Sequence, residues 1–482
     1  MVKHLKSVKT NWLSLAVILL LVFIPLYPKF PLINLPGTYV AIRIEDFLIL
    51  SVVLLWLGLE IKRGLPVLRD RVSQLILLYL GIGGLSLLSA LFITQNIVPH
   101  IALLHWLRRI EYMSLFFVAF ASVKELRNVK SYGLALLITT VGVIIYGLGQ
   151  KFFAWPVVST MNEEFSKGLL LQLTEWARVN STFAGHYDLA AYLVMILALT
   201  SGLMVGLKNK IGKVIIGLIG FFSLYLLVLT ASRVSFVAYL ITITLILLVL
   251  KKYRWLGPIL ALSLVLMFFS GDFAQRYAQT FNIDLSALSS RIKLFEKKEE
   301  VKVVQVPIKV EPEEVVVQKP SPLPLPSYSP FPKKEATAAA VVWKPTTEMA
   351  VKYSSGIRFH VEWPRSIRAF RKNPFLGTGY SSVTLATDND YLRTLAETGL
   401  LGFISFWLIF LEIGRRVVLF VQKEKPGFAK AIVIALFGVA IGLFANAIFI
   451  DVFEASKVAL IFWMLMGILV GLMKLEPAKI KL

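Results

Sequence analysis

The chain has 482 residues, a formal net charge of +22 and no cysteine, and 57% of its residues are hydrophobic. A mean hydropathy of +0.73 excludes an ordinary soluble domain. The lack of cysteine excludes disulfides, thiolate metal sites and a cysteine nucleophile. The five histidines show no metal-ligand spacing, so we expect no structural zinc, and the sequence predicts no cofactor.

Apolar runs long enough to cross a bilayer recur along the chain and are separated by short basic segments. Twelve runs are predicted to form helices: 12–26, 45–59, 72–92, 103–121, 131–149, 187–207, 213–230, 234–250, 255–270, 399–414, 428–450 and 456–473. The predicted fold is therefore an all-α polytopic membrane protein with about 12 transmembrane helices. The first run lacks a small-residue cleavage site, which favours a retained helix over a removed signal peptide.

The basic residues predict the orientation of the chain in the membrane. If the N-terminus is cytoplasmic, the inner segments hold 24 of the 51 lysines and arginines, and the short outer segments hold few. This distribution satisfies the positive-inside rule, so we expect both termini in the cytoplasm. The net charge is then mostly a signal of topology, and nucleic-acid binding is not needed to explain it.

The predicted helices fall into two groups separated by a long outer loop. Residues 1–270 hold the first nine helices and an outer loop at 150–186, and residues 399–482 hold the last three helices and a cytoplasmic tail. Residues 271–398 form the long outer loop between the ninth and tenth helices. Its segment 299–350 is rich in Pro, Ser, Lys and Glu, a composition typical of a disordered spacer. A scaffold protein that binds a partner through this segment is an alternative.

The segment WPRSIRAFRK at 363–372 is predicted to form a helix that lies in the membrane interface. Trp363 and Ile367 belong to its apolar face, and Arg365 and Arg368 belong to its cationic face. The cationic face could bind either phospholipid headgroups or the phosphates of a lipid-linked substrate, and the sequence favours neither interpretation.

Two arginines stand in polar, helix-breaking contexts at the predicted outer surface. Arg178 precedes a polar run that ends at His186, and Arg233 follows the short sequence TAS at 230–232. Arginine near the hydrocarbon region usually pairs, snorkels or binds substrate, and its planar guanidinium suits bidentate phosphate recognition. We predict that Arg178, Arg233 and His186 contribute to a phosphate-binding site.

A second basic group starts the fourth predicted helix. The spacing of His105, Arg108, Arg109 and Tyr112 places these four residues on one helical face. This face either lines an outer substrate cavity, where Arg108 and Arg109 would bind phosphate, or is a salt-bridged helix end with Glu111 as a local partner.

The sequence DNDY at 388–391 follows a Gly-rich stretch and immediately precedes an apolar helix. Asp388 and Asp390 have a D-x-D spacing that can hold a hard cation, and a carboxylate here can also act as general base for a sugar hydroxyl. Capping of the following helix by Asp or Asn is the structural alternative. Asp388 and Asn389 are the candidate catalytic residues, and Tyr391 is a candidate substrate-binding residue.

Three polar segments, in this order and on the same predicted side, resemble the O-antigen ligase and O-antigen polymerase family of bacterial envelope glycosyltransferases. They are Arg178 with 180–183, then 230–233, then 373–379 followed by 389–392 and 397–402. The resemblance implies a mostly helical, GT-C-like membrane fold. It also implies inverting transfer of a glycan from an undecaprenyl-diphosphate carrier, without a metal, at the outer face of the bacterial cytoplasmic membrane.

The same resemblance implies that Arg178 and Arg233 bind the diphosphate and stabilise it as leaving group. Ligases carry a histidine as base before the asparagine of the third segment, and this chain has Asp388 there. Because the ordinary pKa of Asp is near 3.9, Asp388 is a weaker base unless its surroundings raise that value. A polymerase is therefore at least as well supported as a ligase, which would use a lipid or protein acceptor. A transporter or flippase is the non-enzymatic alternative, although the predicted helices show no convincing repeat.

Overall fold

The computed structural model describes residues 11–28, 30–34, 41–157, 172–173, 177–269, 356–383 and 387–475. The predicted Pro-rich spacer at 299–350 lies outside these ranges, as do residues 158–171 and 174–176 of the predicted outer loop at 150–186. The α-helices are α1 (Trp12–Leu26), α2 (Ile44–Ile61), α3 (Arg71–Ser89), α4 (Pro99–Ser122), α5 (Leu126–Phe152), α7 (His186–Gly206), α8 (Lys210–Leu229), α9 (Arg233–Val249), α10 (Leu256–Phe269), α14 (Trp363–Lys372), α15 (Asp390–Lys423), α16 (Phe428–Ala447) and α17 (Ser456–Met473).

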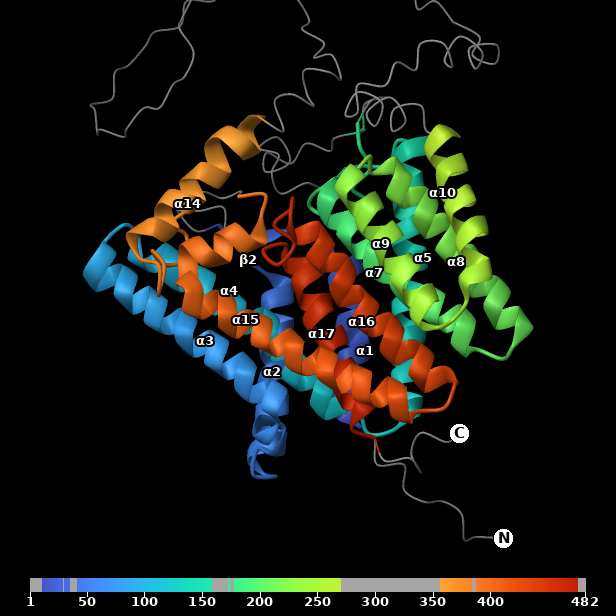
Figure 1. The fold of residues 1–482 in the computed structure, drawn as a ribbon, viewed down its shortest axis with the longest axis horizontal. Helices are drawn as coiled ribbons and strands as arrows, with labels where there is room; N and C mark the ends of the chain where they lie inside the picture. Colours follow the sequence, from blue (N-terminus) through green and yellow to red (C-terminus); the bar gives the residue numbers. More distant parts are fainter. Residues whose placement is uncertain are drawn as a thin grey trace, which may run out of the picture.

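Shorter elements join these helices. The 3-10 turns are η1 (Pro66–Arg69) and η3 (Tyr253–Trp255), and the π-helical turns are η2 (Ala90–Thr94) and η5 (Arg358–Glu362). Two short antiparallel strands, β1 (Pro31–Asn34) and β2 (Ala41–Arg43), connect α1 to α2. Figure 1 shows the helices as one bundle, with α14 at the upper end of the drawing and α8 and α10 along one side.

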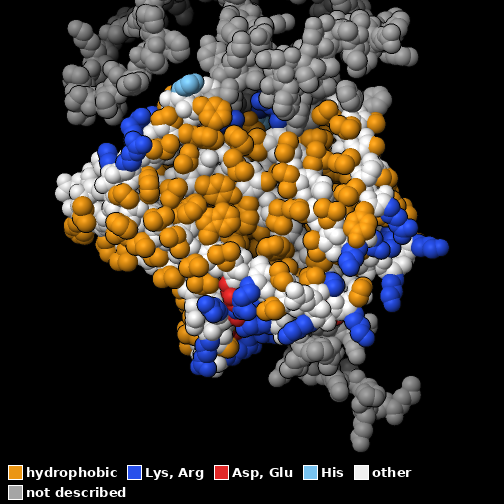
Figure 2. Space-filling view, in the orientation of Figure 1, with side chains coloured by type: hydrophobic (Ala, Val, Ile, Leu, Met, Phe, Trp, Pro, Cys, Tyr) orange, Lys and Arg blue, Asp and Glu red, His pale blue; other side chains and the backbone are white. Residues whose placement is uncertain are grey.

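A helix occupies each of the twelve ranges predicted from hydropathy. Within the described ranges, six helices are long and apolar enough to cross a membrane: Arg71–Thr94, Leu126–Phe152, His186–Gly206, Lys210–Leu229, Phe428–Ala447 and Ser456–Met473. Figure 2 shows a broad hydrophobic surface, with lysine and arginine gathered mainly along its lower and right edges. The chain is therefore a mostly helical integral membrane protein, and the number of crossings stays a prediction.

The largest difference from the predicted elements concerns α15. Hydropathy predicts a helix at 399–414, whereas α15 begins at Asp390 and ends at Lys423. The backbone of Gly399, at φ 66° and ψ −168°, interrupts it. The polar residues 390–398 thus form a first helical section, which a hydropathy criterion assigns to the preceding loop because it contains charged side chains.

The centre of the bundle is α17, whose side chains are almost all buried and which packs along α4. Gly467 and Gly471 lie one turn apart on the face toward α4. A side chain at Gly467 would collide with the Phe116 carbonyl oxygen, and one at Gly471 would approach Val123 Cβ to 2.8 Å. Small residues at this spacing allow two membrane helices to approach closely.

Replacing Gly467 with valine is therefore expected to destabilise the protein, by about 1–3 kcal/mol as for other overpacked cores. The measurement is the melting temperature of purified protein in detergent, followed by loss of the monodisperse chromatographic peak. Gly133→Val is the matched control, because a side chain at Gly133 of α5 meets nothing within 4 Å. Equal melting temperatures for the two variants would contradict the close α17–α4 packing.

Candidate functional site

The Gly-rich segment before α15 is fastened to the break in that helix. The backbone N–H groups of Thr378, Gly379, Leu400 and Leu401 donate to the carbonyl oxygens of Ala396, Glu397, Pro374 and Phe375, over 2.8 to 3.2 Å. These bonds satisfy backbone groups that the interruption at Gly399 leaves without helical partners. Much of the family-like sequence at 373–402 therefore forms a structural frame beside the site.

The turn that precedes α15 is organised by a carboxylate from another part of the chain. Asp451, in the link 448–455 between α16 and α17, accepts hydrogen bonds from the backbone N–H groups of Thr387 (2.7 Å), Asp388 (3.1 Å) and Asn389 (3.1 Å). Arg393 of α15 donates to the same carboxylate at 2.9 Å. Successive N–H groups that converge on one anion hold a defined turn, here with Asp388 at the uncommon φ of 51°.

Asn389, and not Asp388, caps α15. Its Oδ1 accepts from the N–H of Leu392 at 2.9 Å, and its Nδ2 donates to the Ile448 carbonyl at 3.0 Å. Both the oxygen and the nitrogen of the Asn389 side-chain amide therefore form hydrogen bonds within the protein. A catalytic role for Asn389 stays a prediction, while its capping role follows from this geometry.

The carboxylate of Asp388 instead forms an ion pair with Arg358 of η5, in which Nε lies 2.7 Å from Oδ2. Burial raises the pKa of the Asp388 carboxyl above its ordinary value; the ion pair with Arg358 acts against this shift, and the charge of Asp451 acts with it. Burial acts to lower the pKa of Arg358, but Asp388 and Tyr187 together raise it above its ordinary value. Arg358 therefore stays a cation.

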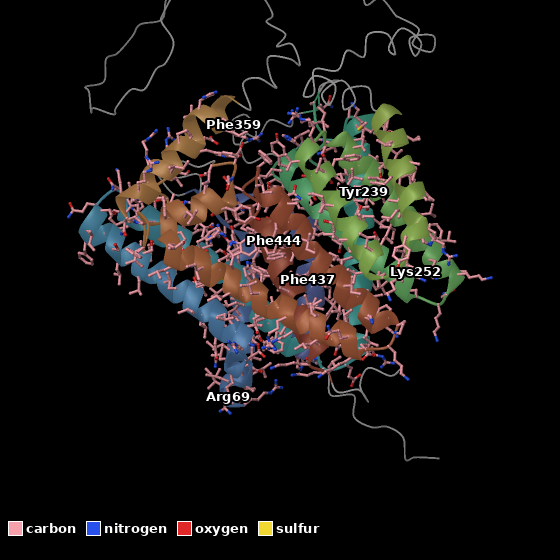
Figure 3. All side chains as sticks on the ribbon, viewed as in Figure 1. Arg69, Tyr239, Lys252, Phe359, Phe437 and Phe444 are labelled. Atoms are coloured by element: carbon pink, nitrogen blue, oxygen red, sulfur yellow. The ribbon has the colours of Figure 1, made fainter. Side chains whose placement is uncertain are left out.

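Arg178 joins Arg358 through the beginning of α7. Its Nη1 lies 2.6 Å from Nε2 of His186, and its guanidinium lies 6.0 Å from the ring centroid of Tyr187. The Tyr187 hydroxyl contacts both Arg178 and Arg358. We call Arg178, His186, Tyr187, Arg358 and Asp388 the arginine–aspartate cluster. Figure 3 labels Phe359, which follows Arg358, at the end of the bundle that carries α14.

Three other predicted arginines lie near this end of the bundle. Arg233 is the half-buried first residue of α9, which packs against α7. Arg365 of α14 is half-buried, and its charge acts on Glu362 at the end of η5. Arg368 is exposed on α14, whose bounds coincide with the predicted 363–372.

Arg108 and Arg109 are paired with protein groups. Arg108 Nη1 lies 2.7 Å from an Asp46 oxygen and 2.9 Å from a Glu111 oxygen. Arg109 donates to the Phe453 carbonyl at 2.9 Å and forms an ion pair with Glu454. This geometry is that of the salt-bridged helix end, the alternative to a phosphate site, and phosphate binding by either residue stays untested.

Tyr391 and the D-x-D carboxylates are the remaining candidates, and each of them contacts other protein groups. The hydroxyl of Tyr391 donates to the Phe444 carbonyl at 2.7 Å, and its ring stacks on Trp407 with centroids 5.8 Å apart. The two carboxylates of the D-x-D sequence have different partners, since Asp390 accepts from the N–H of Phe453 at 3.1 Å while Asp388 binds Arg358. Tyr391 and Asp390 therefore have structural contacts.

Sequence reasoning did not select Arg358, Tyr187 or Asp451 as site residues. Arg358 is a cation within the otherwise largely apolar sequence IRFHVEW, and Asp451 is an acid in a short link between two apolar helices. Such charges are costly near a membrane and usually have a partner or a function. This cost is the sequence signal that could have selected Arg358 and Asp451. The sequence does not indicate which residues they contact.

The fold and the site define an integral membrane protein with a cationic cluster and an acidic turn at one end of a helical bundle. Residues 218–407 match the family described as O-antigen ligase, a segment that begins within α8 and ends within α15. The resemblance predicted from the sequence is confirmed for this part of the chain. The match includes Arg233, Arg358 and Asp388, whereas Arg178 precedes it. No curated protein matches the chain.

Proposed function

We propose that the chain is an inverting glycosyltransferase that moves a glycan from an undecaprenyl-diphosphate carrier to an acceptor during the synthesis of a bacterial surface polysaccharide. The observation that carries this proposal is that Arg178 and Arg358 both contact Tyr187. Arg358 also forms an ion pair with Asp388. A diphosphate needs fixed positive charge when it leaves, and two guanidinium groups supply that charge without a metal. Membership of the O-antigen ligase family supports the same substrate class.

The cluster lies at one end of the bundle, and the basic residues of the predicted inner loops support the orientation. Lys251, Lys252 and Arg254 follow α9, whereas Arg233 begins it, so the two groups lie at opposite ends of that helix. The positive-inside rule then puts the arginine–aspartate cluster at the outer face of the cytoplasmic membrane. A lipid-linked diphosphate presented at this face reaches the cluster from the bilayer surface.

In this mechanism an acceptor hydroxyl attacks the anomeric carbon of the donor sugar from the side opposite the diphosphate. Arg178 and Arg358, with Arg233 from the start of α9, bind the diphosphate as negative charge develops on it. A carboxylate takes the proton of the attacking hydroxyl, and Asp388 is the carboxylate that the sequence puts forward for this step. The diphosphate leaves with the electron pair of the broken bond.

Asp388 at the position of the ligase histidine favours a polymerase, which uses a second lipid-linked glycan as acceptor, over a ligase. Reconstitution of the purified protein in vesicles with an undecaprenyl-diphosphate-linked glycan separates the possibilities. A polymerase lengthens the glycan on its carrier, a ligase moves it to a different molecule, and a flippase changes its leaflet without a new glycosidic bond.

The arginines themselves give a test in cells. Arg178→Ala and Arg233→Ala should each abolish long-chain surface polysaccharide, with transfer rates lowered on the order of 100-fold or more, because each removes a cation from the leaving group. The measurement is the length distribution of surface glycan after complementation of a deletion strain. Arg254→Ala, at an exposed position at the opposite end of α9, is the control and should leave the distribution unchanged. Normal chains in both test variants would exclude the proposed site.

A further inference from the structure

We propose that Glu362 is the group that accepts the proton of the acceptor hydroxyl, and that Asp388 acts through Arg358 as a positioning residue. This assignment rests on the proposed glycan transfer and names the base of that reaction. Glu362 lies outside every motif that the sequence singles out. Its place in the fold, its unused oxygen and the charges around it carry the assignment.

The position of Glu362 is set by η5 and its contacts. Residues four apart in a π-helical turn lie about one turn apart, so Glu362 follows Arg358 along nearly the same face of η5. The next residue, Trp363, packs its ring on Phe449 with centroids 5.8 Å apart, and Phe359 packs edge-on against Trp363 at 4.8 Å. Phe449 belongs to the same link as Asp451. These contacts hold η5 against the acidic turn.

The charged groups that act on Glu362 come from four of the segments that the structure describes. They are Asp388 from the turn before α15, Asp451 from the α16–α17 link, Arg358 from η5 and Arg365 from α14. Arg358 is already committed to Asp388 at 2.7 Å, and Asp451 is held by Arg393 and three backbone N–H groups. Asp388 and Asp451 thus each hold an arginine in an ion pair, whereas Arg358 and Arg365 act on Glu362 through their charge.

One oxygen of Glu362 is ready to receive a proton. Its Oε2 is buried and has no hydrogen-bond partner among the residues that the structure describes. The same holds for Nε1 of Trp363, the next residue, and for Oγ1 of Thr387, which directly precedes Asp388 in the acidic turn. Buried polar atoms normally have partners, so an unused set beside a site indicates groups reserved for a ligand. Asp388, in contrast, would have to break its ion pair with Arg358 before it could take a proton.

The acidity of Glu362 suits this role. Burial raises its pKa, the charges of Asp388 and Asp451 raise it further, and Arg358 and Arg365 act against the shift, with the result at about 7. A base is most effective when its pKa lies near the working pH. In the reaction, the hydroxyl oxygen bonds to the anomeric carbon, the bond to the diphosphate breaks with its electron pair, and the hydroxyl proton passes to Glu362. The neutral acid then loses that proton to water.

The test is the pH dependence of kcat for the full-length protein in vesicles with an undecaprenyl-diphosphate-linked glycan. Glu362 is charged only above its pKa, so the wild-type rate should rise as the pH increases through about 7. Glu362→Gln should lower kcat by roughly 100-fold or more and remove this rise, whereas Glu362→Asp should restore a rise. Glu424→Gln, at the far end of α15, is the matched control and should behave as wild type.

Asp388→Asn separates the two carboxylates and gives a second test that does not depend on Glu362→Gln folding. Removing Asp388 deletes a charge that raises the Glu362 pKa and releases Arg358, so the rise in rate should persist and move to lower pH. A rise that disappears in Asp388→Asn, or one that survives in Glu362→Gln, would overturn the assignment. A wild-type protein that makes no glycosidic bond would instead contradict the proposed function itself.

Discussion

Replacing Arg358 with alanine is expected to abolish glycan transfer, with a loss on the order of 100-fold or more because a cation is removed from the leaving diphosphate. The same change leaves the half-buried Asp388 carboxylate without its partner at 2.7 Å, which costs up to about 3–5 kcal/mol of stability if the pair behaves as a fully buried one. The measurements are the transfer rate in vesicles and the melting temperature in detergent.

Two further variants separate charge from geometry at this position. Arg358→Lys keeps the cation but loses the planar fork that reaches Asp388 and Tyr187, so it should fold better than Arg358→Ala and still transfer poorly. Arg371→Ala changes an exposed arginine of α14 and should match wild type in both measurements. Wild-type transfer by Arg358→Ala would exclude Arg358 from the diphosphate site.

Replacing Gly399 with alanine is expected to prevent α15 from bending and so to destabilise the whole site. The backbone of Gly399, with φ 66° and ψ −168°, costs a residue with a side chain about 1–3 kcal/mol, and its Cβ would also collide with the Phe375 carbonyl group. The backbone bonds that join 373–379 to 396–401 would then be strained or lost. The measurement is the yield and melting temperature of monodisperse protein.

Gly257→Ala is the control for this prediction, since a side chain at Gly257 meets nothing within 4 Å. A Gly399→Ala protein that melts at the wild-type temperature would show that the break in α15 tolerates a side chain.

Most of the helices were predictable because lipid imposes a simple requirement on sequence. A helix that crosses the hydrocarbon region must be mostly apolar along its length, whether it faces lipid or the bundle interior, so α1, α8 and α17 are visible as apolar runs. The helix α14 was predictable for a related reason, since a cationic and an apolar face alternate at helical spacing. The first section of α15 escaped this criterion because Arg393 and Glu397 are buried in protein and not in lipid.

The candidate site was predictable only in part. Arg178, His186 and Asp388 were selected from the sequence, and the structure brings them together. Arg108 and Tyr391 were also selected, but they contact Asp46 and the Phe444 carbonyl instead. Residue type and spacing cannot distinguish these cases, because an arginine that pairs with protein and one that faces a substrate have the same cost near a membrane.

By itself, the sequence determined the class of this protein: an integral membrane protein of many apolar helices, in which residues 218–407 match the O-antigen ligase family. These properties depend on local composition and on short motifs, which are present in the sequence before the chain folds. Only the tertiary structure decided that Asn389 caps α15, that Asp388 binds Arg358 and that Glu362 keeps an unused oxygen beside them. Those contacts join η5, the turn before α15 and the α16–α17 link. Because these segments are far apart in sequence, their charged side chains become partners only when the helices pack into the bundle.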